Sequence, residues 1–68
     1  MNKQKKFQEL DTIVLMHDIK EHSLKKGDMG AIVHVYSKGE AFEIEFVTVK
    51  GKTKALLTLK PTDIQKII

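Results

Sequence analysis

Three histidines are the residues of this sequence best suited by type to metal binding or proton transfer. His17 and His22 enclose Asp18 and Glu21, and such a mixture of imidazole and carboxylate groups is typical of metal ligands. A polar loop, however, fixes no coordination geometry, so we expect both histidines to be solvated. We predict no metal ion and no other cofactor. The chain contains no cysteine, which excludes a disulfide, a thiolate metal site and a thiol nucleophile.

The carboxylates and hydroxyl groups form no catalytic pattern. Glu43 and Glu45 are two residues apart and would share the outward face of a strand, whereas glycosidase chemistry needs one desolvated carboxyl group facing the other across a cleft. His34 is expected opposite Glu43, where a cross-strand pair explains it. Ser23 and Ser37 fall in turns without a neighbouring histidine–carboxylate arrangement. We therefore predict no catalytic residue and no enzyme activity.

The positive charge comes entirely from lysine. Twelve lysines and nine acidic residues give a net charge of +3. Lysine lacks the planar fork with which arginine reads bases and grips phosphates, and Tyr36 is the single outward aromatic that the pattern offers for base stacking. These clusters favour a solubilising face, and weak, sequence-nonspecific nucleic-acid binding is the alternative function. Its candidate residues are Lys25, Lys26, Lys50, Lys52 and Lys54.

The elements that must position these residues are mainly strands. A chain of 68 residues is one small domain, here residues 1–68 with residues 1–10 as an N-terminal arm. Alternating and β-branched apolar residues predict strands, and Pro61 interrupts the pattern with a helical turn before the last of them. The expected strands are 12–16, 29–36, 41–47, 53–59 and 64–68, with a long ordered loop at 17–28.

The register follows from the third strand, where Phe42, Ile44 and Phe46 must face inward. If Lys38-Gly39 and Lys50-Gly51 are two-residue turns, every partner of these three residues is apolar; a three-residue loop with a glycine bulge is the alternative. The expected partners are Val35, Val33 and Ala31 on one side, and Leu59, Leu57 and Ala55 on the other. This predicts an all-β, five-stranded SH3-like barrel; an OB-fold would need a further helix.

Three stretches, Leu24–Tyr36, Gly39–Phe46 and Ala55–Ile64, resemble a family of short bacterial proteins of unknown function. The resemblance implies an SH3-like barrel and no assigned activity. The core Gly27-Asp28-x-Gly30-x-Ile32-Val33 is also similar to the small barrels of KOW-type proteins and of the nitrile hydratase β subunit. Close backbone approach and turns with positive φ explain the glycines equally well.

An exposed apolar row points to protein binding. The predicted register places Ile32, Glu45 and Leu56 together on the outer face with Tyr36 nearby, and clustered exposed apolar residues mark interaction sites. Covering by Phe7 or Leu10 of the arm is the alternative. The candidate protein-binding residues, including two on the long loop, are Ile19, Leu24, Ile32, Tyr36 and Leu56.

We therefore expect a non-catalytic protein–protein interaction module, by analogy an accessory or neutralising subunit of a two-protein bacterial system. The partner is an unidentified protein, and self-association stays open. Residues 1–6 are basic but lack a following apolar run, so no signal peptide is predicted. No stretch is long and apolar enough to span a bilayer, and a cytoplasmic location is expected.

Overall fold

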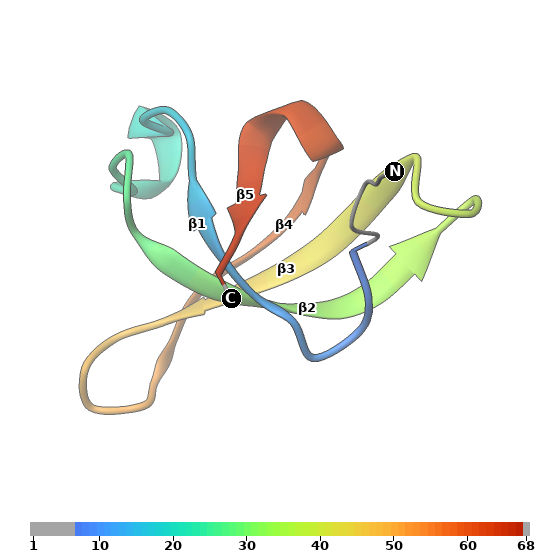
Figure 1. Ribbon diagram of the computed structural model, residues 1–68. Helices are drawn as coiled ribbons and strands as arrows, with labels where there is room; N and C mark the ends of the chain where they lie inside the picture. The colour runs from blue at the N-terminus through green and yellow to red at the C-terminus, as the bar shows by residue number, and fades with distance from the viewer. Residues whose placement is uncertain (1–6, 68) are drawn as a thin grey trace.

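The computed structural model describes residues 7–67, which form one antiparallel five-stranded sheet (Figure 1). Its elements are β1 (Thr12–Leu15), η1 (Lys20–His22), β2 (Met29–Tyr36), β3 (Ala41–Val47), β4 (Thr53–Leu59), η2 (Pro61–Asp63) and β5 (Ile64–Lys66). The predicted all-β class, the long loop after the first strand and the helical turn before the last are confirmed. The 3₁₀ turn η1 within the long loop was not predicted, and position 68 of the last predicted strand lies outside the described residues.

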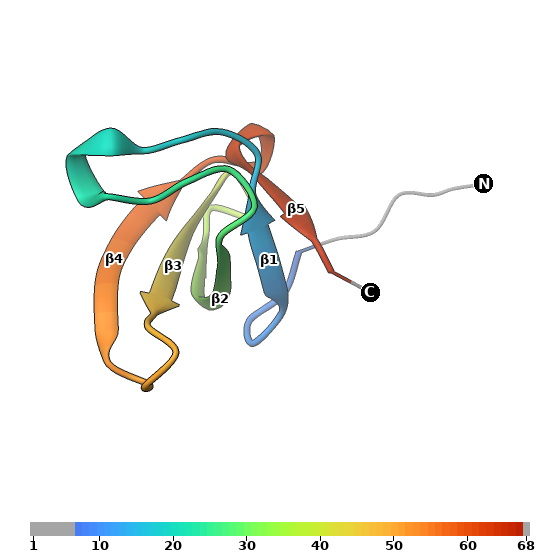
Figure 2. The ribbon, with the colours of Figure 1, turned by 90° about the vertical axis from the view of Figure 1, so that its left-hand side faces the viewer.

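The strands pair in the order β4-β3-β2-β1-β5. The sheet curls around its core, with β4 and β5 at its two edges (Figure 2). Because the last strand returns to pair with the first, the order is the one expected of a small SH3-like barrel. The side chains of Ile13, Leu15, Ile32, Phe42, Ile44 and Phe46 are the largest that are fully buried.

The predicted register between the third and fourth strands is confirmed. Phe42 pairs with Leu59, Ile44 with Leu57 and Phe46 with Ala55. The turn itself is the three-residue alternative, since the Thr48 N–H donates to the Lys52 carbonyl at 2.8 Å and Gly51 has φ +84°. A register shift just beyond Phe46 compensates for the extra loop residue and restores the predicted pairing.

The predicted register between the second and third strands is right near the turn and wrong beyond it. Val35 pairs with Phe42 as expected, but Ile32, not Val33, pairs with Ile44, because a β-bulge falls between Ile32 and His34. A bulge sets two residues of one strand against one of its partner, so the parity of the strand changes there. Ile32 is consequently fully buried, whereas Val33 is 41% exposed.

The same bulge places Gly30 opposite Phe46. A Cβ atom at residue 30 would lie 2.8 Å from Cγ2 of Ile44 and 2.9 Å from the Phe46 ring. Glycine therefore lets the backbone of β2 lie against these two buried side chains, the close approach that glycine alone allows. This is the packing reason for the second glycine of the predicted core motif.

The described part of the predicted N-terminal arm is attached to the barrel. Phe7 packs against the core, with its ring centroid 5.0 Å from that of Phe42. The Leu10 N–H donates to the Ile32 carbonyl at 2.7 Å, but the Leu10 side chain is 84% exposed. Phe7 and Leu10 are the two arm residues proposed to cover the outer apolar row. The Phe7 side chain packs against the core, whereas the Leu10 side chain stays exposed.

Candidate functional site

The structure separates the five predicted protein-binding residues. Ile32 is fully buried and Leu24 is 2% exposed, so neither can contact a partner through an exposed side chain, contrary to the predicted placement. The bulge turns Ile32 inward, and Leu24 packs into the core from the long loop. Ile19 is half-buried against the same core, while Tyr36 and Leu56 are exposed. The predicted outer apolar row therefore does not form.

The surface around Tyr36 is polar. Its hydroxyl donates to Oε1 of Glu43 at 3.3 Å, and Thr58 Oγ1 donates to the same oxygen at 2.7 Å. Desolvation, followed by the charge and hydrogen bond of Glu43, raises the pKa of Tyr36. His34 pairs with Glu43 in the ladder as predicted, and its ring lies edge-on to Tyr36 with centroids 4.5 Å apart. The exposed apolar residues of this face are thus divided by satisfied polar groups.

A different surface is both apolar and concave. A groove of about 590 Å³ lies between the long loop and the tip of the β3–β4 hairpin, within the range of sites that receive small ligands or side chains. Met29 is 58% exposed, Val47 49% and Val49 fully exposed. The lining residues are Leu24, Gly27, Asp28, Met29, Phe46, Val47, Thr48, Val49 and Lys54.

The loop wall of the groove is held by backbone hydrogen bonds. Ile19 and Leu24 form an isolated antiparallel bridge, with N···O distances of 2.9 and 3.1 Å. The Gly27 N–H donates to the Leu15 carbonyl at 2.8 Å, which the positive φ of Gly27 (+93°) permits. Oδ2 of Asp28 accepts the Lys25 N–H at 2.9 Å. These bonds hold the loop in a single geometry beside the sheet.

The hairpin wall is held by one threonine. Thr48 Oγ1 accepts the N–H groups of Lys50 and Lys52 at 3.3 and 3.2 Å, and the Thr48 carbonyl accepts the Gly51 N–H at 2.9 Å. The side chain thus closes the turn, as hydroxyl groups commonly do. Val49 is left at the tip with its side chain in solvent. The apolar residue is therefore presented outward by a locally satisfied turn.

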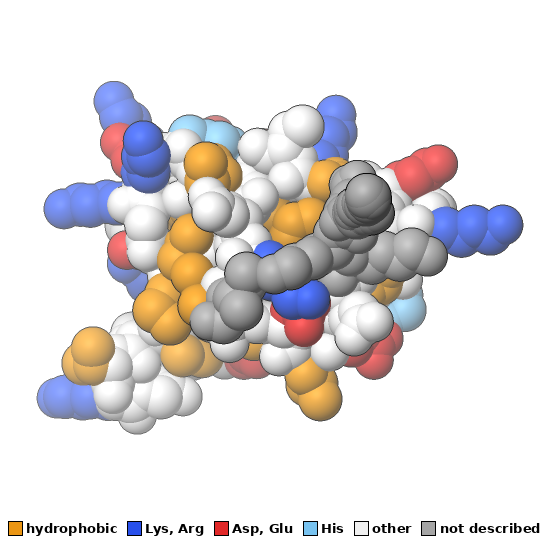
Figure 3. All heavy atoms as spheres, in the orientation of Figure 1, with side chains coloured by type: hydrophobic (Ala, Val, Ile, Leu, Met, Phe, Trp, Pro, Cys, Tyr) orange, Lys and Arg blue, Asp and Glu red, His pale blue; other side chains and the backbone are white. Residues whose placement is uncertain are grey.

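Lysines border the groove on both walls. Lys54 lines it, while Lys25 and Lys26 lie between two lining residues of the loop, and Lys50 follows Val49 at the hairpin tip. All of these side chains are exposed, as is that of Lys52. Hydrophobic side chains gather between the loop and the hairpin, and lysine side chains project from both (Figure 3). Of the predicted nucleic-acid residues, Lys54 thus lines the groove, and Lys25, Lys26 and Lys50 adjoin lining residues in the sequence.

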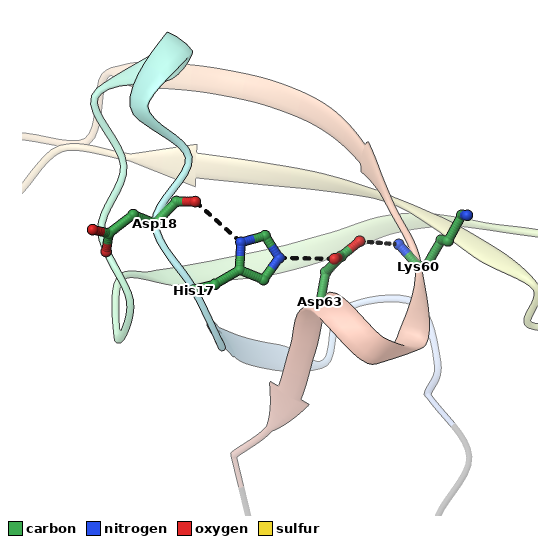
Figure 4. A network of polar contacts seen from close by, with 4 residues as sticks. All are labelled: His17, Asp18, Lys60 and Asp63. Carbon is green, nitrogen blue, oxygen red and sulfur yellow. Dashed lines mark hydrogen bonds and ion pairs between the residues drawn. The ribbon is translucent and has the colours of Figure 1, made fainter.

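His17 connects the long loop to η2 (Figure 4). Its Nε2 lies 2.8 Å from Oδ1 of Asp63 and its Nδ1 lies 3.0 Å from the Asp18 carbonyl. Both partners are acceptors, so the imidazolium form satisfies both contacts, and the bond to Asp63 followed by that to Asp18 raises the pKa of His17. Burial opposes ionisation of Asp63, but the His17 bond and the Lys60 N–H bond at 2.8 Å outweigh it and lower the pKa of Asp63. The pair fixes the start of the loop.

The described residues contain no group of three or more histidine or acidic side chains that could hold a metal ion. Both ring nitrogens of His17 contact protein oxygens, and His22 does not share this arrangement. The arrangement around His17 is thus a loop anchor, with its acceptors supplied by the loop and by η2.

The prediction from the sequence missed Met29, Val47 and Val49 as surface residues. Each of them had a signal of its own in the sequence. Val49 is a β-branched residue beside the Lys50-Gly51 turn, where polar residues predominate. Val47 has the same outward parity as Glu43 and Glu45. Met29 stands immediately before the inward Gly30. That the loop and the hairpin line one groove around these positions could not be deduced from strand parity.

Fold and groove together define a small barrel-like all-β domain with one apolar, lysine-bordered groove between its long loop and a hairpin tip. A family described as a domain of unknown function (DUF4926) matches residues 9–66. The chain belongs to this family, as the resemblance predicted. No curated protein and no solved structure matches the chain. No helix within residues 7–67 is long and apolar enough to cross a membrane.

Proposed function

We propose that this chain is a non-catalytic module that binds a partner protein through the groove between the long loop and the β3–β4 hairpin. The observation that carries the proposal is the exposure of Met29, Val47 and Val49 around a concave apolar surface. Exposed apolar side chains gathered in this way mark interaction sites. Burial of such side chains by a partner would contribute roughly 25 cal/mol per Å² removed from water.

The chemistry of the lining favours binding over catalysis. Asp28 supplies the carboxylate of the lining and already accepts a backbone hydrogen bond, and Lys54 supplies the ammonium group of the lining. General acid–base catalysis relies on titratable groups held within hydrogen-bond reach of a substrate. The groove instead presents methyl and thioether groups, which stabilise a complex by desolvation.

The rigidity of both walls supports the same function. The loop is fixed by the Ile19–Leu24 bridge and by the contact of His17 with Asp63, and the hairpin is closed by Thr48. A preorganised surface loses little conformational entropy on binding. By analogy in size and family, the module would be an accessory or neutralising subunit of a two-protein bacterial system in the cytoplasm.

The proposal is tested by affinity capture from the native host with matched variants. The double variant Val47→Asp/Val49→Asp places two carboxylates at the groove, whereas Leu56→Asp places one carboxylate at a residue of β4 about as exposed as Val47, 55% against 49%. We expect one protein to be retained by the unaltered chain and by the Leu56 variant, and lost by the double variant. Circular dichroism checks that all three are folded.

Two outcomes contradict the proposal. Retention of the same protein by the double variant would place the contact elsewhere. Loss with Leu56→Asp alone would assign binding to the outer face around Tyr36 instead. Light scattering of the purified chain distinguishes self-association, because a dimer that the double variant abolishes would make the partner a second copy.

A further inference from the structure

We infer that the groove receives an acidic segment of a partner protein, whose apolar side chains enter the groove while its aspartates and glutamates contact the surrounding lysines. The inference rests on the proposed function and names the chemistry of the partner. Residues 24–29 and 47–54, which form the two walls, contain five lysines and one aspartate and so carry a net charge of +4. The other described residues, 7–23, 30–46 and 55–67, contain four lysines and eight acidic residues and so carry a net charge of −4. Within residues 7–67 the positive charge is therefore concentrated in the two walls.

The lysines of the walls are available for a partner. Within residues 7–67, Lys25, Lys26, Lys50, Lys52 and Lys54 form no ion pair. By contrast, Lys66 on β5 contacts Asp11 at 3.2 Å. Asp28, the aspartate of the loop wall, accepts the backbone N–H group of Lys25 at 2.9 Å, and Asp18, earlier in the loop, accepts that of Lys26 at 2.8 Å. Both carboxylates thus help to shape the loop, and the five lysine side chains of the walls are exposed.

The apolar lining of the groove and the lysines around it distinguish between two kinds of polyanionic partner, a nucleic acid and an acidic peptide. A single-stranded nucleic acid would need exposed aromatic side chains for base stacking, but Phe46, the aromatic residue of the lining, is 1% exposed. Met29, Val47 and Val49 offer aliphatic and thioether surface instead. Such surface matches leucine, isoleucine or methionine side chains of a peptide, and the lysines match its carboxylates.

The exposure of the lysines also determines what their charges contribute to binding. Exposed ion pairs each add little to affinity, but a field of one sign speeds association and rejects partners of the same sign. Affinity would therefore come from the apolar residues and selectivity from the lysines. Substitution of either set should weaken binding, and salt should affect only the contribution of the lysines.

Peptide selection tests the inference directly, since the natural partner need not be identified first. A random peptide library displayed on phage is depleted on the Val47→Asp/Val49→Asp variant and then panned against the intact chain. We expect enriched peptides to combine at least two large apolar residues with a net negative charge. The most enriched peptide is then synthesised with a fluorophore, and its affinity is measured by fluorescence polarisation.

A matched set of lysine variants tests the rim. Lys25→Glu/Lys54→Glu changes one lysine on each wall and should weaken the peptide about tenfold. Lys38→Glu reverses a single lysine, half the charge change of the double variant, at the tip of the β2–β3 hairpin outside the groove, and should leave the affinity within about twofold. High salt should weaken binding to the unaltered chain more than to the double lysine variant.

Four results would overturn the inference: enrichment of neutral or basic peptides, no enrichment, equal binding by the double lysine variant, or displacement of the peptide by a thymidine oligonucleotide at a lower concentration than by unlabelled peptide. The last would favour nucleic acid as the occupant. These failures are distinguishable from failure of the proposed function. If a partner is still captured from the host in a manner that depends on Val47 and Val49, the protein-binding function stands with a partner of different charge.

Discussion

Substitution of Gly30 by alanine tests the packing that gives the sheet its shape. The added Cβ would lie 2.8 Å from Cγ2 of Ile44 and 2.9 Å from Cδ1 and Cε1 of Phe46, about 0.6 Å inside an ordinary carbon–carbon contact. Both neighbours are at most 1% exposed, so neither can move aside freely. Overpacking of this kind costs about 1–3 kcal/mol, and the removal of a strand glycine returns about 0.5–1 kcal/mol.

We expect a net loss of about 2 kcal/mol of unfolding free energy, because the added methyl group overlaps two buried side chains. For a domain of this size the loss corresponds to a Tm lower by about 8–16 °C. Urea denaturation followed by circular dichroism measures the free energy, and calorimetry measures Tm. A Gly30→Ala variant as stable as the unaltered chain, or more stable, would refute the reasoning.

A double-mutant cycle identifies the cause. Gly30→Ala combined with Phe46→Leu should cost at least about 0.5 kcal/mol less than the two single changes together, because the ring that meets the new methyl group is gone. Gly27→Ala is the matched control: its Cβ would have no atom within 4 Å, although φ is +93°. Its cost, about 1–2 kcal/mol of backbone strain, should add to that of Phe46→Leu. Coupling in the control and additivity in the test pair would contradict the explanation.

Three further changes test the core, the outer face and the loop anchor. Ile32→Glu should abolish cooperative unfolding, since it buries an unpaired carboxylate. Leu56→Gln, an uncharged polar change at an exposed residue opposite Glu45, should change stability by less than about 0.5 kcal/mol; urea titrations compare the two variants. Leu24→Ala should cost about 2–5 kcal/mol and increase amide exchange in the loop. Because the pKa of His17 is raised above 6.5, the stability it contributes is complete below that pH and is lost as pH rises through the raised value. His17→Asn should therefore remove a fall in Tm between pH 6 and 8, and an unchanged pH profile would contradict the anchor.

Strand parity predicted most of the fold. The inward set Phe42, Ile44 and Phe46 and its pairing with β4 follow from alternation alone, because one face of the strand carries glutamates. The bulge before His34 could not be predicted in this way. It depends on how the sheet bends to close around its core, which is a property of all five strands together. The extra residue of this bulge places Ile32 in the core, whereas the sequence predicted it on the surface.

The candidate site was predicted less well than the fold. The sequence offered five lysines as candidate nucleic-acid residues, but it did not indicate that Lys54 lines an apolar groove or that Lys25, Lys26 and Lys50 are sequence neighbours of its lining residues. That arrangement arises because the loop and the hairpin tip, which are far apart in the sequence, line the same groove in the folded chain. The sequence indicates Leu24 as a contact residue of the loop, whereas its burial is what fixes the loop there. The sequence does not distinguish an apolar side chain that anchors a loop in the core from one that is exposed for a partner to contact.

The groove as the partner-binding surface is tested most directly by amide hydrogen exchange of the chain with and without its captured partner. We expect slower exchange on binding in residues 24–29 and 47–54, with exchange at 34–36 and 56–58 unchanged. Slower exchange confined to the outer-face segments, with the groove segments unaffected, would contradict the account.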